Sequence, residues 1–308
     1  MMALMRFRSG SERAAPIDPL VPDFLDGFSI EVMPRTAAKV DDFRAILPIG
    51  TRVYVAHIEG TSIEDMVATA RRLSSDGFRV MPHFPARIIK DEAMIEDWVA
   101  RYQGEAGVED ALVLAGGVAS PVGKFDSSMQ LLETGAFDRA GFKHLHVAGH
   151  PEGNRDIDPD GGTRNVDSAM RWKSAFNERT DAEMALVTQF AFEAGPIIEW
   201  ANGVRDAGIG LPVHVGIAGP ARLQTLIKFA IACGVGPSLK VLQRRAIDVG
   251  KLLLPFEPDE VVKALARHKA DVPDSAITCL HLFPLGGITT AATWARARST
   301  TEAAALTA

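Results

Sequence analysis

Residues 52–84, RVYVAHIEGTSIEDMVATARRLSSDGFRVMPHF, contain two short valine-bearing apolar runs separated by a segment with helical spacing. The runs at 52–58 and 79–84 have the length of strands, and 61–77 is amphipathic at the period of a helix. Thr61 or Ser62 can cap the start of that helix, and Gly77 can end it. The order strand, helix, strand predicts two parallel strands covered by the helix that joins them.

The same pattern recurs along the chain. Amphipathic helical spacing is also found at 91–103 and 258–269. An open doubly wound sheet is the alternative, but no GxGxxG motif follows the first predicted strand. Eight β/α units in 308 residues therefore predict an α/β fold, a single-domain (β/α)8 TIM barrel. The six further strands are predicted at 28–33, 111–116, 144–149, 185–190, 212–217 and 276–283.

Composition and charge indicate the domain bounds, the cellular location and the kind of partner expected. A flexible N-terminal arm is predicted over 1–24, the barrel over 25–298 and a C-terminal tail over 299–308. The net charge of -6 argues against nucleic acid, and no apolar run reaches the ~20 residues of a membrane span. Cys233 and Cys279 lie in apolar runs and are predicted to be free thiols. A cytoplasmic protein with a small-molecule partner, and with neither a nucleic-acid nor a membrane partner, is expected.

Polar side chains at the predicted strand ends mark the candidate site, because the active sites of such barrels lie at the carboxyl ends of the strands. Glu31 shares a strand face with Ser29, so an inward face brings a carboxyl group into the barrel. Burial there would raise its pKa and make it a proton donor, although an ion pair with Arg35 at the rim is equally compatible with the sequence. The side-chain amide of Gln189 offers hydrogen-bond donors and an acceptor to a heterocycle. Alternatively, it is a polar residue at the rim that forms hydrogen bonds with the backbone.

Two other chemistries are common in barrels of this kind. Six histidines lie in or near strands, but the first strand lacks the HxH pair typical of metal-dependent barrel hydrolases, so no metal site is predicted. A lysine-based aldolase needs a lysine at a strand end, and none of the eight predicted strands contains one. The histidines in question are His57, His83, His146, His150, His214 and His281.

Several of these segments resemble the methylenetetrahydrofolate reductase family over about residues 26–298. FSIEVMPR at 28–35 is similar to the family's first strand, TQFAFE at 188–193 to its TQFFFD segment, and MPHFPA at 81–86 to the end of its third strand. The resemblance implies that Glu31 is the catalytic acid, that Gln189 holds the folate ring and that His83 lies beside the cofactor. It also implies substrate contacts for Ser29 and Leu223.

The resemblance further implies a set of cofactor residues. HPEGN at 150–154 is similar to the family's PExHP loop, and NERTDA at 177–182 to its KRKVDA stretch near the flavin phosphates. Where the family has an Arg-Gly-Asp turn against the flavin, this chain has three small residues, which puts FAD in question. The implied cofactor-binding residues are Ala115, Gly116, Gly117, His150, Asn154 and Arg179.

The implied activity is an oxidoreductase of one-carbon metabolism that reduces 5,10-methylenetetrahydrofolate to 5-methyltetrahydrofolate. NADH or NADPH supplies the electrons, with FAD or by direct transfer, and Glu31 gives a proton to N10. The product would serve methionine biosynthesis or folate recycling. The alternatives are a metal-dependent barrel hydrolase and a folate-binding relative without catalytic activity.

Overall fold

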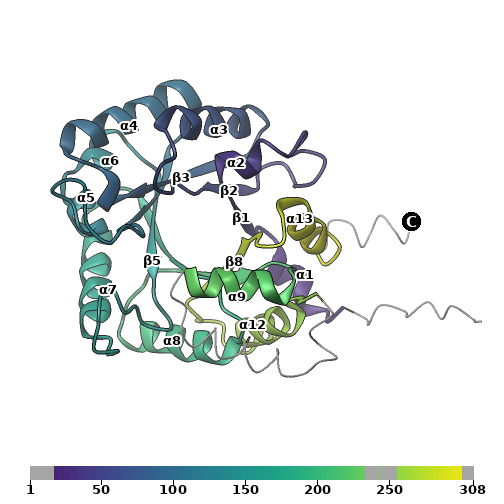
Figure 1. Ribbon diagram of the computed structural model, residues 1–308. Coiled ribbons are helices and arrows are strands. Elements are labelled where there is room, and N and C mark those ends of the chain that lie inside the picture. The colour runs from purple at the N-terminus through teal and green to yellow at the C-terminus, as the bar shows by residue number, and fades with distance from the viewer. Residues whose placement is uncertain (1–16, 233–241, 243–254, 300–308) are drawn as a thin grey trace, which may run out of the picture.

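The computed structural model describes residues 17–232, 242 and 255–299. Its eight strands form one closed parallel barrel in sequence order (Figure 1). Each observed strand overlaps a predicted one, so the (β/α)8 TIM barrel is confirmed. The strands are β1 (Ser29–Val32), β2 (Arg52–Val55), β3 (Arg79–Pro85), β4 (Asp110–Leu114), β5 (His144–Gly149), β6 (Glu183–Thr188), β7 (Val213–Ala218) and β8 (Ile277–Phe283).

The barrel closes where β1 pairs with both β2 and β8. Ser29 lies opposite His281 on one side, and Glu31 lies opposite Tyr54 on the other. Residues that are far apart in the sequence therefore become neighbours around the barrel interior. This closure sets the composition of the site described below.

A ring of helices covers the barrel, as the view in Figure 1 shows. The helix predicted at 61–77 begins after Ser62, whose side chain accepts a hydrogen bond from the Asp65 amide, and is followed by Gly77 at a φ of 89°. The described helices are α1 (Leu20–Leu25), α2 (Pro34–Ala37), α3 (Ile63–Ser75), the 3-10 helix η1 (Ala86–Ile88), α4 (Glu92–Ala106), α5 (Ser128–Glu133), α6 (Ala136–Arg139), α7 (Arg164–Asn177), α8 (Ala194–Asp206), α9 (Leu223–Ala232), α12 (Asp259–Asp271) and α13 (Ile288–Arg296).

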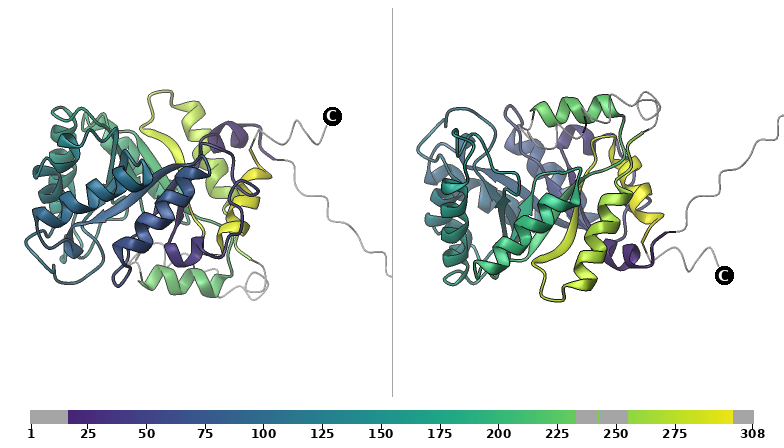
Figure 2. Two further views of the ribbon diagram at one scale, coloured as in Figure 1. Left: turned by 90° about the horizontal axis from the view of Figure 1, so that it is seen from above. Right: turned by 90° about the horizontal axis from the view of Figure 1, so that it is seen from below.

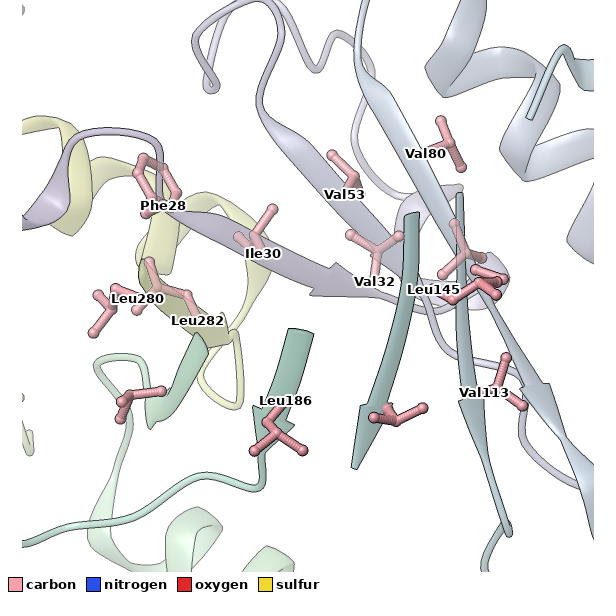
Figure 3. Close-up of a cluster of buried hydrophobic side chains, with 14 of the residues drawn as sticks. Phe28, Ile30, Val32, Val53, Val80, Val113, Leu145, Leu186, Leu280 and Leu282 are labelled. Carbon is pink, nitrogen blue, oxygen red and sulfur yellow. The ribbon is translucent and has the colours of Figure 1, made fainter. Parts of the chain in front are cut away.

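The two faces of the strands differ in chemistry. The outer faces carry branched apolar side chains that pack under the helices, which is where the main core of this barrel lies (Figure 3). The inner faces carry a small apolar group, Tyr54, Met81, Leu112 and Val187, among many polar side chains. The outer-face residues labelled in Figure 3 are Ile30, Val32, Val53, Val80, Val113, Leu145, Leu186, Leu280 and Leu282.

Charged side chains fill the amino-terminal end of the barrel. The carboxylate of Asp110 contacts a ring nitrogen of His144 at 2.7 Å. It also lies 3.7 Å from the guanidinium of Arg79 and 3.8 Å from that of Arg52. These groups lie at the starts of four neighbouring strands. They therefore close the end of the barrel that is opposite to the expected active site.

The predicted boundary of the N-terminal arm needs a correction. Residues 20–25, largely assigned to the arm, form α1, and its side chains Val21, Phe24 and Leu25 are buried in the core. The barrel domain therefore begins before residue 25. The remainder of the predicted arm, 1–16, and the predicted tail at 300–308 lie outside the described residues, as does Cys233.

Helix α9 lies outside the ring of covering helices. In Figure 2 it lies at one end of the barrel, and it begins five residues after β7 ends, which identifies that end as the carboxyl-terminal one. Its Leu223 and Leu226 pack with Phe190, Phe192 and Phe256 in a second apolar cluster. One side of the barrel mouth is therefore walled by apolar side chains.

Candidate active site

Glu31 enters the barrel near its carboxyl-terminal end. It is the third residue of β1, and Ile30 and Val32 on either side of it point out into the core. Its Oε2 lies 3.3 Å from Nε2 of His83 and 3.9 Å from Nε2 of His281. Alternation along β1 left open which face points inward, and in the structure Glu31 lies on the inner face. In the described part of the chain the carboxylate contacts these two histidines rather than Arg35.

The surroundings of Glu31 favour its ionised form over the protonated form that was expected from burial. Burial raises the pKa of the carboxyl, but the contacts with His281 and His83 outweigh it and lower the pKa from 4.5 to about 2. The side chain keeps 21% of its surface exposed. Glu31 is therefore a carboxylate near neutral pH, and any proton that it donates must first be supplied to it.

Ser29 and His281 lie deeper in the barrel than the tip of Glu31. Oγ of Ser29 is 2.9 Å from Nδ1 of His281, as the pairing of these residues across β1 and β8 requires. Ser29 is only 1% exposed, so it supports His281 and does not line the mouth. The substrate contact predicted for Ser29 is corrected accordingly.

A second layer of polar side chains lies beneath the site. The Tyr54 hydroxyl is 2.6 Å from Nδ1 of His146, and the His146 ring meets the edge of His214 at 4.7 Å. Burial raises the pKa of Tyr54 and lowers that of His146 well below 6.5; burial, with Arg52 and His281, lowers the pKa of His214 to about 3. These groups are neutral at pH 7, so the one carboxylate of Glu31 lies above an uncharged polar layer.

Gln189 directly follows β6 and is exposed at the carboxyl end of the barrel. The hydroxyl of Thr188 donates to the Gln189 carbonyl at 2.9 Å and accepts from the Gly216 amide at 2.8 Å. The backbone of Gln189 is thus tied to β7. Its side chain lies at the end of the barrel where Glu31 lies, as predicted.

The predicted cofactor residues separate into two groups. Ala115, Gly116 and Gly117 follow β4, and His150 and Asn154 follow β5, so all five lie at the carboxyl-terminal face. Burial, and then Lys173, lowers the pKa of His150 to about 4. The Asn154 side chain accepts from the Asp156 amide at 2.8 Å, which is a local turn contact. All the predicted cofactor residues except Arg179 therefore lie toward this end of the barrel.

Arg179 does not join them. It lies in the connection from α7 to β6, which is at the amino-terminal face, and its guanidinium packs 4.8 Å from the Phe176 ring centroid and 5.4 Å from that of Trp172. The prediction that Arg179 binds flavin phosphates is therefore wrong. The turn at 115–117 also has no charged side chain, and a Cβ at Gly116 would lie 2.9 Å from Pro85 Cβ. Ala115, Gly116 and Gly117 therefore offer no charged side chain to a flavin phosphate.

Leu223 is the first residue of α9 and is 4% exposed. It lies in the apolar cluster with Phe190 and Phe192, which directly follow β6. Its place at the carboxyl-terminal face agrees with the prediction. Its burial, however, makes it part of the wall that supports the mouth.

Lys173 is a residue that the sequence did not reveal. It belongs to α7, is 5% exposed, and its Nζ donates to the Ala148 carbonyl at 2.8 Å, near the end of β5. Burial lowers its pKa to about 8. A lysine expected within a strand would not include Lys173, because this side chain reaches the barrel from a covering helix. Its hydrogen bond to β5 gives it a structural part at the rim.

A cavity of about 610 Å³ lies beside the mouth, between the segments that follow β1 and β2. Met33 and Pro34 on one side and Ile58 and Thr61 on the other are among its lining residues. This groove is separate from the Glu31 carboxylate, which is not among the residues that line it. The candidate catalytic groups therefore lie inside the barrel and not in this groove.

Two further findings concern other classes of site. Among the described residues, no group of three or more histidine, cysteine, aspartate or glutamate side chains has an arrangement that could hold a metal ion. No described helix is long and apolar enough to cross a membrane.

These features define a (β/α)8 barrel with a polar interior and a carboxylate between two histidines at its mouth. No family model matches the chain. A solved structure with a TM-score of 0.55 and 11% identity, covering 89% of this chain and 96% of the other, is an uncharacterized protein from Clostridium thermocellum that binds two copies of 5-methyl-5,6,7,8-tetrahydrofolic acid. A mannohexaose complex of Thermomonospora fusca beta-mannanase, at 16% identity, covers 61% of this chain and 68% of its own with a TM-score of 0.36. At these identities the first likeness shows the fold alone, and the second carries no argument.

Proposed function

We propose that this chain binds a reduced folate at the carboxyl-terminal mouth of the barrel and reduces 5,10-methylenetetrahydrofolate to 5-methyltetrahydrofolate with NADH or NADPH. The observation that carries the proposal is the inward carboxylate of Glu31, with Oε2 3.3 Å from Nε2 of His83 at the mouth. A carboxyl group and an imidazole in contact can hold and move one proton. The Clostridium thermocellum barrel, which binds 5-methyltetrahydrofolic acid, supports a folate as the ligand.

The other side chains at this end suit a pterin ring. The amide of Gln189 offers donors and an acceptor, and the same end carries the apolar cluster of Phe190, Phe192 and Leu223. A flat ring with polar edges needs this combination of an apolar wall and a few polar groups. Gln189 is proposed to bind the ring edge while the proton reaches N10 from Glu31.

Hydride is proposed to pass directly from the nicotinamide to the folate. The positions expected to hold a flavin carry no charged group at 115–117, and Arg179 lies at the opposite end of the barrel. Overall, hydride from the nicotinamide and one proton convert the methylene bridge into the N5 methyl group and leave N10 protonated. The chain's own residues supply that proton and orient the ring.

The test compares the chain with Glu31→Gln and with the control Glu178→Gln, an exposed carboxyl at the end of α7. Conversion is followed by NAD(P)H oxidation together with mass-spectrometric detection of 5-methyltetrahydrofolate. Loss of a general acid lowers the rate by ~10²- to 10⁴-fold, so E31Q should lose turnover to this extent while binding 5-methyltetrahydrofolate about as tightly as the wild type. E178Q should keep wild-type turnover.

Other outcomes identify the alternatives. Near wild-type turnover in E31Q would remove Glu31 from the mechanism. Folate binding without any NAD(P)H oxidation by the wild type would favour a binding protein without catalytic activity. Activity that is lost on chelation and restored by a divalent metal would favour a metal-dependent hydrolase.

A further inference from the structure

Because the contacts of Glu31 favour its carboxylate form, its proposed role as an acid needs a source of protons. Two imidazole rings approach the same oxygen, Oε2, from β3 and from β8. Their surroundings differ in burial and in partners. That difference decides which ring can supply the proton.

His281 is the structural partner. It is completely buried, its Nδ1 contacts the Ser29 hydroxyl at 2.9 Å, and the rings of Tyr54 and Phe283 lie 4.4 and 4.7 Å away. Burial lowers the pKa of His281 more than the neighbouring Glu31 raises it. A neutral ring, closed off from solvent, orients the carboxylate and has no path by which to take up a proton.

His83 is placed differently. It lies two residues before the end of β3, so it is nearer to the mouth, and its side chain keeps 11% of its surface exposed. Its Nε2 makes the shorter contact with Glu31 and is itself buried, with no other partner among the described side chains. The exposed part of the His83 ring therefore lies away from Nε2, so one side of the ring faces the carboxylate while another part reaches the surface of the mouth.

The groups that face His83 from the neighbouring strands leave Glu31 as its single anionic contact. Tyr54 on β2 lies edge-on at 6.4 Å, and burial raises its pKa, so it remains a phenol. His57, which follows β2, is held neutral because burial, the largest effect, lowers its pKa. Glu31 is thus the carboxylate placed to exchange a proton with His83.

We propose that His83 and Glu31 form a proton relay in which His83 takes a proton from solvent and passes it from Nε2 to Oε2 of Glu31 when a folate covers the mouth. This inference rests on the proposed function. Water stabilises an ion pair more than a neutral pair, so its exclusion by the bound ring favours neutral imidazole and neutral carboxyl. Closure of the site by substrate thus converts Glu31 into the acid at the point of use.

The step balances without a further reactant. The proton on His83 Nε2 moves to Glu31, and Glu31 gives a proton to N10 of 5,10-methylenetetrahydrofolate. The bond between N10 and the methylene carbon breaks with its electron pair going to N10, and the N5 lone pair forms an iminium. Hydride from NAD(P)H reduces that carbon to the methyl group. His83 then regains a proton from solvent after the product leaves.

The test measures single-turnover rates from pH 5 to pH 9 for the wild type, His83→Gln, His281→Gln and the control His268→Gln, which lies on the outer helix α12. H83Q should lose ~10²-fold or more in rate while binding 5-methyltetrahydrofolate within about threefold of wild type. Without the relay, Glu31 must take its proton directly, so the fall of rate with rising pH should begin at lower pH in H83Q. H281Q should lose rate without that displacement, and H268Q should match the wild type.

A second variant separates proton supply from structure. In His83→Ala, added imidazole should restore a concentration-dependent part of the rate, which a purely structural role would not allow. An H83Q profile that falls at the wild-type pH, or H83A that imidazole does not rescue, overturns the relay while leaving the proposed function intact. A wild type that reduces no methylenetetrahydrofolate overturns both.

Discussion

Ser29 shows how a single hydroxyl can set the surroundings of the carboxylate that is proposed to be catalytic. Its Oγ contacts Nδ1 of His281 at 2.9 Å, and the other nitrogen of that ring lies 3.9 Å from Glu31. The hydroxyl therefore decides which nitrogen of His281 faces the carboxylate. Among the described residues, the histidines on either side are the side chains that hold the Glu31 carboxylate.

Ser29→Ala should destabilise the protein and slow the reaction together. It leaves a buried imidazole nitrogen without a partner, which costs about 1–3 kcal/mol of unfolding free energy. Urea denaturation measures that loss, and turnover should fall about tenfold because His281 no longer holds Glu31 in one orientation. The control Ser75→Ala, at an exposed position at the end of α3, should change stability by less than about 0.5 kcal/mol. A fully stable and fully active S29A would contradict this account of His281.

At the scale of elements, the contact between β6 and β7 positions Gln189. Gly216 on β7 lies so close to β6 that a Cβ there would be 2.4 Å from the Thr188 carbonyl oxygen and 2.6 Å from that of Gln189. Both are backbone atoms, so no side-chain rotation can relieve the overlap. The absence of a side chain at residue 216 is thus what lets the end of β6 lie where it does.

Gly216→Ala should therefore separate the two strands and move Gln189. Overpacking of this kind lowers the free energy of unfolding by about 1–3 kcal/mol. Because the Gln189 side chain moves with the end of β6, affinity for 5-methyltetrahydrofolate should weaken by about tenfold. The matched control is Gly104→Ala in α4, where an added Cβ meets nothing within 4 Å and helix propensity favours alanine. Denaturation and ligand titration of both variants test the idea. It fails if G216A is as stable and binds as well as G104A.

On the scale of the whole molecule, the barrel separates an apolar exterior from a polar interior. Its main core lies between strands and helices, while the interior holds buried neutral histidines above a charged amino-terminal end. Few groups beside those histidines can balance the positive charge of a protonated ring. Protonating them in the folded state is therefore unfavourable, and acid should destabilise the whole barrel.

The sign of this effect follows from His214. Its pKa is lowered to about 3 in the fold, first by burial, whereas the unfolded chain titrates near 6.5. Between these values the unfolded state binds the proton and the folded state does not, so stability is present above pH 6.5 and is lost as the pH falls toward 3. At up to ~1.4 kcal/mol per pH unit, one such group removes about 2 kcal/mol between pH 7.5 and 5.0.

Urea denaturation at pH 7.5 and 5.0 tests this prediction. His214→Gln should lose about 2 kcal/mol less than the wild type over that interval, whatever its stability at pH 7.5. His268→Gln, on the covering helix α12 and outside the barrel interior, should show the wild-type loss. Equal losses in the wild type and H214Q would show that the interior histidines do not govern acid stability.

Much of the architecture could be read from local sequence. Each strand is marked by an apolar run and each long helix by its own periodicity and caps, such as Ser62 and Gly77 around α3, because these signals depend only on residues close in the chain. Alternation on β1 placed Glu31 and Ser29 on one face, but which face points inward was decided by the closed barrel. The proposed catalytic role of Glu31 and the folate contact of Gln189 stay predictions.

What the sequence determined by itself was therefore the (β/α)8 barrel and the end of it that carries the polar side chains. Only the tertiary structure decided that Glu31 is ionised, that Ser29 supports His281 and that Arg179 lies at the far end. The charge of a buried carboxyl depends on the groups within a few ångströms of it. Here those groups are His83 and His281, which barrel closure brings to Glu31 from 52 and 250 residues farther along the chain.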